Sequence, residues 1–214
     1  MMNVMFVGKM ASGKTHASKF LESKYGYIHM ALAGPIKELE DCYENMGQDG
    51  FEREAYRILH TEGGLSEETV EKFLDIFVPN VGEIPRELPK PRKRYQYIGT
   101  DLGRNQISPT IWIDILLHNK NKNINVVIDD TRFQNEIDYL KPHNFVSIKL
   151  NVDKDIQRER LQVLYGLSDQ DIESALAHAS EKEIDDITCD YEVGANQSLI
   201  KMFLNIEKIL ESIK

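Results

Sequence analysis

Several features that would each point to a particular class of protein are scarce or missing in this sequence. Only two cysteines occur, Cys42 and Cys189, and they lie too far apart to form a C-x-x-C pair. This spacing argues against a zinc site built from cysteines, so we expect two ordinary, partly buried thiols. No apolar run approaches the roughly 18 residues of a membrane-spanning helix, and we therefore expect no membrane partner.

Positive charge is also scarce over the chain as a whole. The 214 residues include 26 Lys and Arg against 35 Asp and Glu, which gives a formal net charge of −9. A general nucleic-acid binder needs a positive face, so we expect no nucleic-acid partner. The N-terminus lacks the charged-then-apolar order of a signal peptide, which makes the cytoplasm the expected location. An acidic protein that binds an anionic ligand must gather its positive charge locally.

The first residues of the chain contain a pattern suited to that purpose. Gly8, Gly13, Lys14 and Thr15 satisfy G-x-x-x-x-G-K-S/T, the P-loop, between a strand-like run and a helix-like run. Glycine lets backbone N–H groups approach phosphate oxygens closely, and the following helix presents the positive end of its dipole. Lysine can reach the β- and γ-phosphates, and the threonine hydroxyl can bind Mg²⁺. The expected nucleotide-binding residues are Gly8, Ala11, Ser12, Gly13, Lys14, Thr15 and His16.

Strand-like and helix-like segments alternate along the whole chain. This order favours an α/β fold, a parallel sheet of about five strands with helices on both faces, in a single domain over 1–214. We expect strands at 4–7, 28–31, 126–130, 145–152 and 191–193. We expect helices at 14–24, 36–45, 67–77, 110–117 and 199–213, the third with Ser66 as its N-cap. The proline-rich stretch 79–91 is interpreted as a loop or flap, and the charged segment up to 186 as a lid or a surface helical hairpin.

Two aspartates follow a short apolar strand well after the P-loop. A strand of this kind that ends in aspartate is how a P-loop fold presents a carboxylate beside Mg²⁺. Asp129 and Asp130 are therefore the candidate metal ligands, together with Thr15. Strand alternation places the two aspartates on opposite faces, so at most one should face the metal, and the sequence does not choose between them.

Other candidates have both a structural and a ligand-binding interpretation. The basic run Arg86, Lys90, Arg92, Lys93 and Arg94 is either a solvated loop or, through Arg94 together with Arg104, a clamp for a second anion. Lys37 is either a surface charge or a substrate ligand. Trp112 is either core or a platform for a base. Arg132 either pairs with Glu136 at i,i+4 or binds phosphate at the carboxyl end of its strand.

The order of several motifs resembles that of the phage-type deoxynucleoside monophosphate kinases. The motifs are GKMASGKT from residue 8, ALAGPIKEL from 31, RYQYIGTDLGR from 94, VVIDDTRFQNE from 126, HASE from 178 and DYEVGAN from 190. They span nearly the whole chain, and GT-x-x-x-R followed by D-x-R-F-x-N-E is the most restrictive combination. In that family ATP, with Mg²⁺, phosphorylates a deoxynucleoside 5′-monophosphate to the diphosphate.

The resemblance implies a P-loop kinase fold with a substrate-binding insertion at about 35–105 and a lid at about 153–186. It implies an ATP-dependent phosphotransferase in which Arg104 and Arg132 address the acceptor phosphate and lid arginines act on the transferred group. The implied catalytic residues are Lys14, Arg104, Arg132, Arg158 and Arg160. Together with the candidates given above, the expected acceptor-binding residues are Lys37, Arg94, Gln96, Arg104, Trp112, Arg132 and Glu136. Similar enzymes form dimers, so a homodimer is one expectation.

Two alternative functions remain open at this point. Another small-molecule P-loop kinase, similar to dephospho-CoA kinase or phosphomevalonate kinase, would differ only in its acceptor. A nucleotide-dependent switch is the other, but the D-x-x-G and N-K-x-D motifs of a GTPase are both absent. The sequence leaves the accepted bases, the preference for deoxyribose over ribose, and the oligomeric state undecided.

Overall fold

The computed structural model describes residues 2–87, 90–121, 123–176 and 179–213. The chain divides into two compact units: unit 1 comprises Met1–Met30 and Lys122–Lys214, and unit 2 comprises Ala31–Asn121. The region at about 35–105, expected to bind substrate, therefore falls within unit 2. His178, the first residue of the HASE motif, lies outside the described residues.

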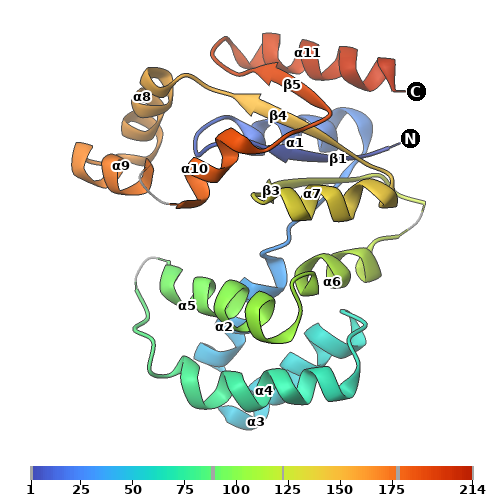
Figure 1. The fold of residues 1–214 in the computed structure, drawn as a ribbon, viewed down its shortest axis with the longest axis vertical. Helices are drawn as coiled ribbons and strands as arrows, with labels where there is room; N and C mark the ends of the chain where they lie inside the picture. The colour runs from blue at the N-terminus through green and yellow to red at the C-terminus, as the bar shows by residue number, and fades with distance from the viewer. Residues whose placement is uncertain (1, 88–89, 122, 177–178, 214) are drawn as a thin grey trace. The chain divides into compact units, whose positions relative to one another are not determined.

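Unit 1 is built on a parallel sheet of five strands (Figure 1). The strands lie in the order β2-β3-β1-β4-β5, and each neighbouring pair is parallel. Their bounds are β1 (Asn3–Val7), β2 (Ile28–Met30), β3 (Val126–Thr131), β4 (Phe145–Asn151) and β5 (Tyr191–Gly194). The predicted parallel α/β sheet is confirmed, and each strand lies where its apolar run predicts it.

Helices cover both faces of this sheet. Their bounds are α1 (Lys14–Tyr25), α7 (Gln134–Leu140), the 3-10 turn η3 (Lys141–His143), α8 (Lys154–Tyr165), α9 (Asp169–Leu176), α10 (Ala179–Asp186) and α11 (Leu199–Ser212). On one face Val4 and Phe6 of β1 form a continuous core with Leu21 of α1 and Ile206 of α11. The opposite face is covered by α7 (Figure 1). The layers follow from strand alternation, because successive apolar residues of a strand buried on both faces need partners on both sides.

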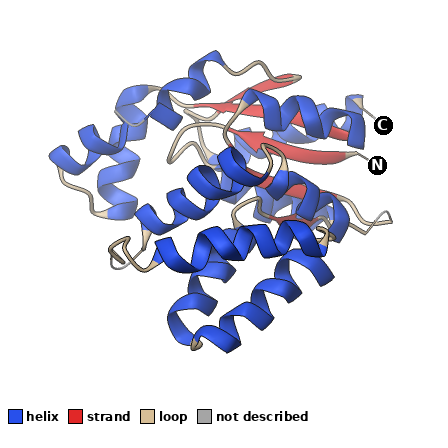
Figure 2. Cartoon of the chain, turned by 60° about the horizontal axis from the view of Figure 1, so that its bottom comes forward, coloured by secondary structure: helices blue, strands red, loops and turns tan. Residues whose placement is uncertain are grey.

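The described regular structure of unit 2 is helical (Figure 2). Its elements are α2 (Gly34–Asn45), α3 (Gln48–Tyr56), the π-helix η1 (Arg57–Thr61), α4 (Glu67–Val81), α5 (Arg92–Gln96), the π-helix η2 (Tyr97–Ile107) and α6 (Ile111–Asn119). An aromatic core joins α2, α3 and α4: the rings of Phe51 and Phe77 stack at 4.8 Å, and Tyr43 meets both edge-on. Packed aromatic pairs of this kind add to the area they bury.

Two local expectations are wrong in unit 2. The predicted loop over 79–91 is wrong only at its start, because α4 continues through Pro79 to Val81, and the described residues 82–87, 90 and 91 are irregular. The basic residues from Arg92 to Gln96 form the short helix α5, which leads directly into η2. The apolar stripe of α4 explains the first result: Phe77 and Val81 are fully buried one turn apart, so the core holds the helix together past its proline.

The predicted N-cap of α4 is present. Ser66 has extended backbone angles, and its Oγ accepts a hydrogen bond from the backbone N–H of Thr69 at 3.2 Å. We expect Ser66→Ala to lower the free energy of unfolding by about 1 kcal/mol, because the Thr69 N–H loses its partner. Ser66→Asp, which keeps an acceptor, should remain close to wild type. Urea denaturation of the three proteins measures both effects, and equal loss in both variants would contradict a capping role.

Two further expectations about the whole chain can be compared with the structure. Both cysteines are free thiols, Cys42 buried and Cys189 partly buried, as the sequence predicts. No helix in the described part of the chain is long and apolar enough to cross a membrane.

Candidate functional site

The P-loop joins the carboxyl end of β1 to the first turn of α1. Gly13 is the N-cap of α1 with φ of 98°, a left-handed conformation that favours glycine. At Gly8 neighbouring atoms leave no room for a side chain. An added Cβ would lie 2.6 Å from the Ser12 Oγ and 2.8 Å from the Leu150 carbonyl oxygen. Both glycines of the motif are therefore required by the local geometry, independently of any ligand.

The loop holds its lysine in place. The Lys14 ammonium donates to the carbonyl oxygens of Gly8 at 2.5 Å and of Lys9 at 2.9 Å. Ala11 adopts a left-handed φ of 58°, and the Ser12 hydroxyl is fully buried without a hydrogen-bond partner among the described residues. A tight loop with its lysine at the centre and the N-terminus of α1 behind it is a site suited to a phosphate chain.

Asp129 is the aspartate that lies on the α1 face of the sheet. Val127 packs in the core that α1 covers, and Asp129, two residues further along β3, points to the same face. Its carboxylate lies 2.7 Å from the Nε2 of His29, and the Thr15 side chain is near enough to lower its pKa. Between Ile128 and Thr131 the pairing of β3 with β1 shifts register, so alternation does not place Asp130, and the contacts of Asp129 carry the assignment. The structure thus distinguishes two residues that the sequence left equivalent.

The electrostatic environment keeps Asp129 ionised. Burial raises the pKa of Asp129, but the hydrogen bonds from His29 and Thr15 and the charges of His29 and Lys14 outweigh it, so the net pKa lies below its ordinary value. The hydrogen bond to Asp129 raises the pKa of His29, against the opposing effect of burial. An ionised carboxylate therefore lies next to the first turn of α1.

The donor set fits Mg²⁺. The hydroxyl of Thr15 and the carboxylate of Asp129 are both oxygen ligands, and Thr15 is among the groups that lower the pKa of Asp129. Mg²⁺ in phosphoryl-transfer sites is usually held by one or two protein oxygens of this type, with phosphate oxygens and waters completing its octahedron. These two residues could hold the cation, with Lys14 beside it for the phosphates.

Helix α8 supports the P-loop from outside. Gln157, which is 1% exposed, donates its Nε2 to the Met10 carbonyl at 2.9 Å. Arg160 donates to the Ala11 carbonyl at 3.2 Å and to the Ala195 carbonyl at 2.7 Å. Arg160 was predicted to be a catalytic lid arginine; here it links the P-loop to the end of β5. The role of Gln157 could not be predicted from the sequence, because a lone glutamine on a helix gives no signal.

Arg158, the other lid arginine predicted to be catalytic, pairs within the lid segment. Its guanidinium contacts the carboxylates of Asp169 at 3.4 Å and of Glu173, both on α9. All three side chains are more than one third exposed, so the pairs are weak and exchangeable. A phosphate-binding role for Arg158 stays a prediction.

Glu136 has a structural role rather than the predicted one in acceptor binding. It is 2% exposed, and its Oε2 accepts from the backbone N–H groups of Arg132 at 2.8 Å and of Phe133 at 3.2 Å. A glutamate at this position of α7 satisfies N–H groups that the helix cannot satisfy itself. The carboxylate fixes the turn that follows β3, and Arg132 is half-buried in that turn.

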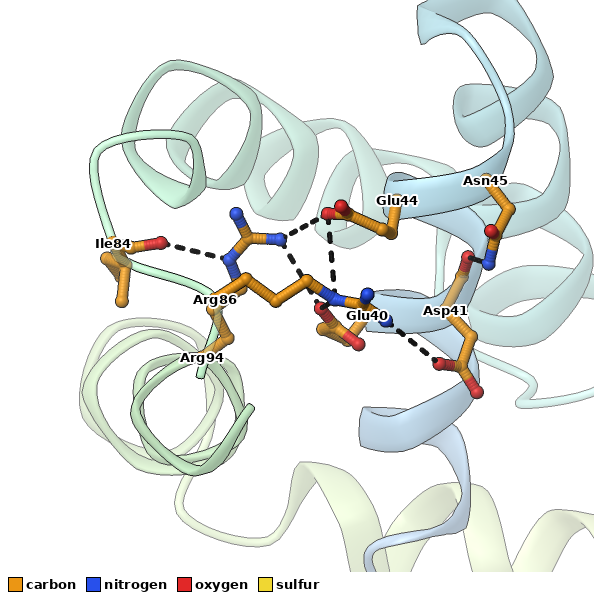
Figure 3. A network of polar contacts seen from close by, with 7 residues as sticks. All are labelled: Glu40, Asp41, Glu44, Asn45, Ile84, Arg86 and Arg94. Atoms are coloured by element: carbon orange, nitrogen blue, oxygen red, sulfur yellow. Dashed lines mark hydrogen bonds and ion pairs between the residues drawn. The ribbon is translucent and has the colours of Figure 1, made fainter. Parts of the chain in front are cut away.

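The predicted phosphate clamp at Arg94 is also corrected. Arg94 is 8% exposed, and its guanidinium contacts Glu44 at 2.6 Å and Glu40 at 3.3 Å and donates to the Ile84 carbonyl at 3.0 Å (Figure 3). Arg86 lies 3.0 Å from the same Glu40. Two arginines are therefore neutralised by glutamates of α2, and breaking such a buried pair is costly. The ion pairs of Arg94 with Glu40 and Glu44 therefore stabilise the packing within unit 2.

The other acceptor candidates of unit 2 lie in different surroundings. Trp112 is 1% exposed and donates its Nε1 to the Gly99 carbonyl at 2.8 Å, so it belongs to the core and not to a base-stacking surface. Lys37 in the first turn of α2 and Gln96 at the end of α5 are exposed, and Arg104 in η2 is half-buried. The π-helix that carries Arg104 is a rare geometry that is frequent at functional sites.

Comparison with known proteins adds one relative in sequence and a likeness in fold. The chain is 29% identical over 164 residues, 71% of its length, to a protein of Acanthamoeba polyphaga mimivirus named "Putative deoxynucleotide monophosphate kinase", of which 74% is covered. It also resembles the crystal structure of TT1252 from Thermus thermophilus, with a TM-score of 0.55 at 11% identity over 100% of this chain and 98% of that one.

A weaker likeness is to shikimate kinase from Bacteroides thetaiotaomicron, with a TM-score of 0.46 at 14% identity over 99% of this chain and 98% of that one. No family model matches the sequence. The resemblance inferred from the motifs is confirmed by the mimivirus relative, and the likeness to TT1252 shows a shared fold.

Proposed function

We propose that the chain transfers the γ-phosphoryl group of ATP to a deoxynucleoside 5′-monophosphate, giving ADP and the deoxynucleoside diphosphate. The observation that carries this proposal is the grouping of Lys14, Thr15 and Asp129 around the P-loop: an ammonium, a hydroxyl and an ionised carboxylate beside a helix N-terminus. The name of the mimivirus relative supports the choice of acceptor.

Binding and charge neutralisation account for most of the chemistry. The donor and the acceptor are both polyanions, so catalysis consists mainly of holding them in line and stabilising the charge that spreads over the transferred group. Lys14 would bind the β- and γ-phosphates, with the backbone N–H groups of the loop around them. Thr15 and Asp129 would hold Mg²⁺, which offsets phosphate charge when bound. No strong general base is required.

Acceptor binding is assigned to residues outside the P-loop. Arg104, with Lys37 and Gln96 of unit 2, is proposed to bind the monophosphate. Arg132 of unit 1 is a separate candidate for binding phosphate. An arginine fork matches phosphate oxygens bidentately, which favours the arginines for the anion itself. Of the seven acceptor-binding residues expected from the sequence, Arg94, Trp112 and Glu136 are buried with structural partners, which leaves these four candidates.

Arg104→Ala tests the acceptor assignment. We expect the kcat/KM for the monophosphate to fall about 10- to 100-fold, because a hydrogen-bonded charged contact is worth about 1.5–3 kcal/mol. The affinity for ATP should stay within about twofold of wild type. Arg53→Ala is the matched control, since Arg53 is exposed on α3 of the same unit. Equal loss of ATP affinity in Arg104→Ala would contradict this role.

The proposed reaction is tested by ADP release. The protein is incubated with ATP, Mg²⁺ and each of dTMP, dGMP, dCMP, dAMP, modified pyrimidine deoxynucleotides and the ribose forms. Rapid turnover of one or more deoxynucleotides supports the proposal and establishes base and sugar preference together. If no monophosphate is turned over while ATP still binds, the acceptor lies outside nucleotides. Dephospho-CoA and phosphomevalonate are then the next acceptors to test.

A further inference from the structure

His29 of β2 contacts the candidate metal ligand Asp129, and no motif in the sequence connects this strand with the site. Its Nε2 lies 2.7 Å from the Oδ1 of Asp129, although the two residues are 100 positions apart in the chain. A carboxylate that is ionised can only accept, so the Nε2 nitrogen carries the donated proton. The side chain of His29 is 35% exposed and that of Asp129 is 12% exposed, so the contact lies at the rim of the sheet and not in bulk solvent.

The register of the sheet explains why this contact forms. His29 in β2 is the parallel partner of Val127 in β3, and Val127 faces the core covered by α1. Residues paired across neighbouring strands point to the same face, and Asp129 shares that face two residues further on. The imidazole therefore extends diagonally along the sheet toward the carboxyl end of β3. Asp129 is held by His29 from β2, and Thr15 of α1 is a neighbour that lowers its pKa.

The contact with His29 has a consequence for the orientation of the Asp129 carboxylate. The terminal torsion of aspartate is broad, so a carboxylate without partners samples many orientations about its last bond. A hydrogen bond to Oδ1 fixes the plane of the group, as carboxylates and carbonyls do for the histidine ligands of metal sites. A ligand that is already oriented loses less freedom when the cation binds.

We propose that His29 is a positioning residue, which holds the Asp129 carboxylate beside Thr15 so that the Mg²⁺ complex of the nucleotide meets an oriented ligand. This inference rests on the proposed function only in taking ATP with Mg²⁺ as the ligand of the P-loop. It does not depend on the acceptor or on turnover. His29 itself contacts neither the cation nor the phosphates in this assignment.

The test is the binding of ATP without any acceptor, measured by calorimetry in excess Mg²⁺ and again in excess EDTA. The dissociation constant of ATP in EDTA, divided by that in Mg²⁺, gives the contribution of the cation to binding. We expect His29→Ala to lower this ratio about 10-fold and to leave the EDTA affinity within about twofold of wild type. His29→Gln, whose amide N–H can reach the same oxygen, should recover most of the ratio. His143→Ala, which removes an exposed histidine of the same unit, should match wild type.

A double-mutant cycle with Asp129→Asn completes the design. If His29 acts through Asp129, His29→Ala should change nothing further in the Asp129→Asn background. The proposal is overturned if His29→Ala leaves the ratio unchanged. This includes the case in which the substitution weakens ATP binding equally in EDTA and in Mg²⁺. It is also overturned if the two substitutions are additive. A wild-type protein that does not bind ATP would instead refute the P-loop assignment, whereas ATP binding without turnover of any monophosphate would refute only the proposed acceptor.

Discussion

Replacing Lys14 with alanine should abolish turnover and leave the protein folded. Lys14 is the lysine that the P-loop pattern specifies, and its ammonium already lies inside the loop against the Gly8 and Lys9 carbonyls. Removing a charge aimed at the transferred phosphoryl group typically costs about 10²- to 10³-fold in kcat. The measurement is ADP release at saturating ATP and monophosphate, with circular dichroism and thermal melting to verify the fold.

The control for this substitution lies on the same helix. Lys19→Ala removes an exposed lysine one turn further along α1 and should leave activity and stability near wild type. Lys14→Ala should melt within a few degrees of wild type, because the loop carbonyls that it releases can be hydrated at the surface. A folded Lys14→Ala protein with wild-type activity would exclude the P-loop as the donor site.

The fold was predictable because its signals are local. The glycines of the P-loop, the apolar runs of the five strands and the stripe of α11 each depend on neighbours within a few positions of the chain. The N-cap at Ser66 was predictable for the same reason, since a cap requires only residues three positions apart. These features agree with one another, and consistency of this kind is what makes a fold readable from sequence.

The roles of individual charges were not predictable, because their partners are distant in sequence. Arg94 pairs with Glu40, 54 positions away, and a basic run read by itself gives no indication of glutamates on another helix. The choice between Asp129 and Asp130 likewise required the register that places Val127 beside His29. Arg104 and Arg132 share this uncertainty, and their roles stay predictions.

Trp112→Ala should produce the largest loss of stability of the substitutions considered. The indole packs so closely that a Cβ on Gly103 would lie 2.5 Å from its Cζ2, and it meets the ring of Phe73 edge-on at 6.4 Å. Truncating a buried tryptophan to alanine typically costs about 3–5 kcal/mol, through lost transfer energy and the cavity left behind. The Gly99 carbonyl would also lose its partner. Urea denaturation followed by circular dichroism measures the loss.

The same residue separates a core role from a base-stacking role. Trp112 is the only tryptophan of the chain, so its fluorescence reports this position alone. A core indole should emit at short wavelength and resist quenching by iodide, and saturating deoxynucleotide should change neither property directly. Trp112→Phe should retain most of the stability and the wild-type KM for the monophosphate. Because a stacking platform is exposed and bound to the base, its removal would instead raise that KM at unchanged stability, and this result would restore the substrate-binding interpretation of Trp112.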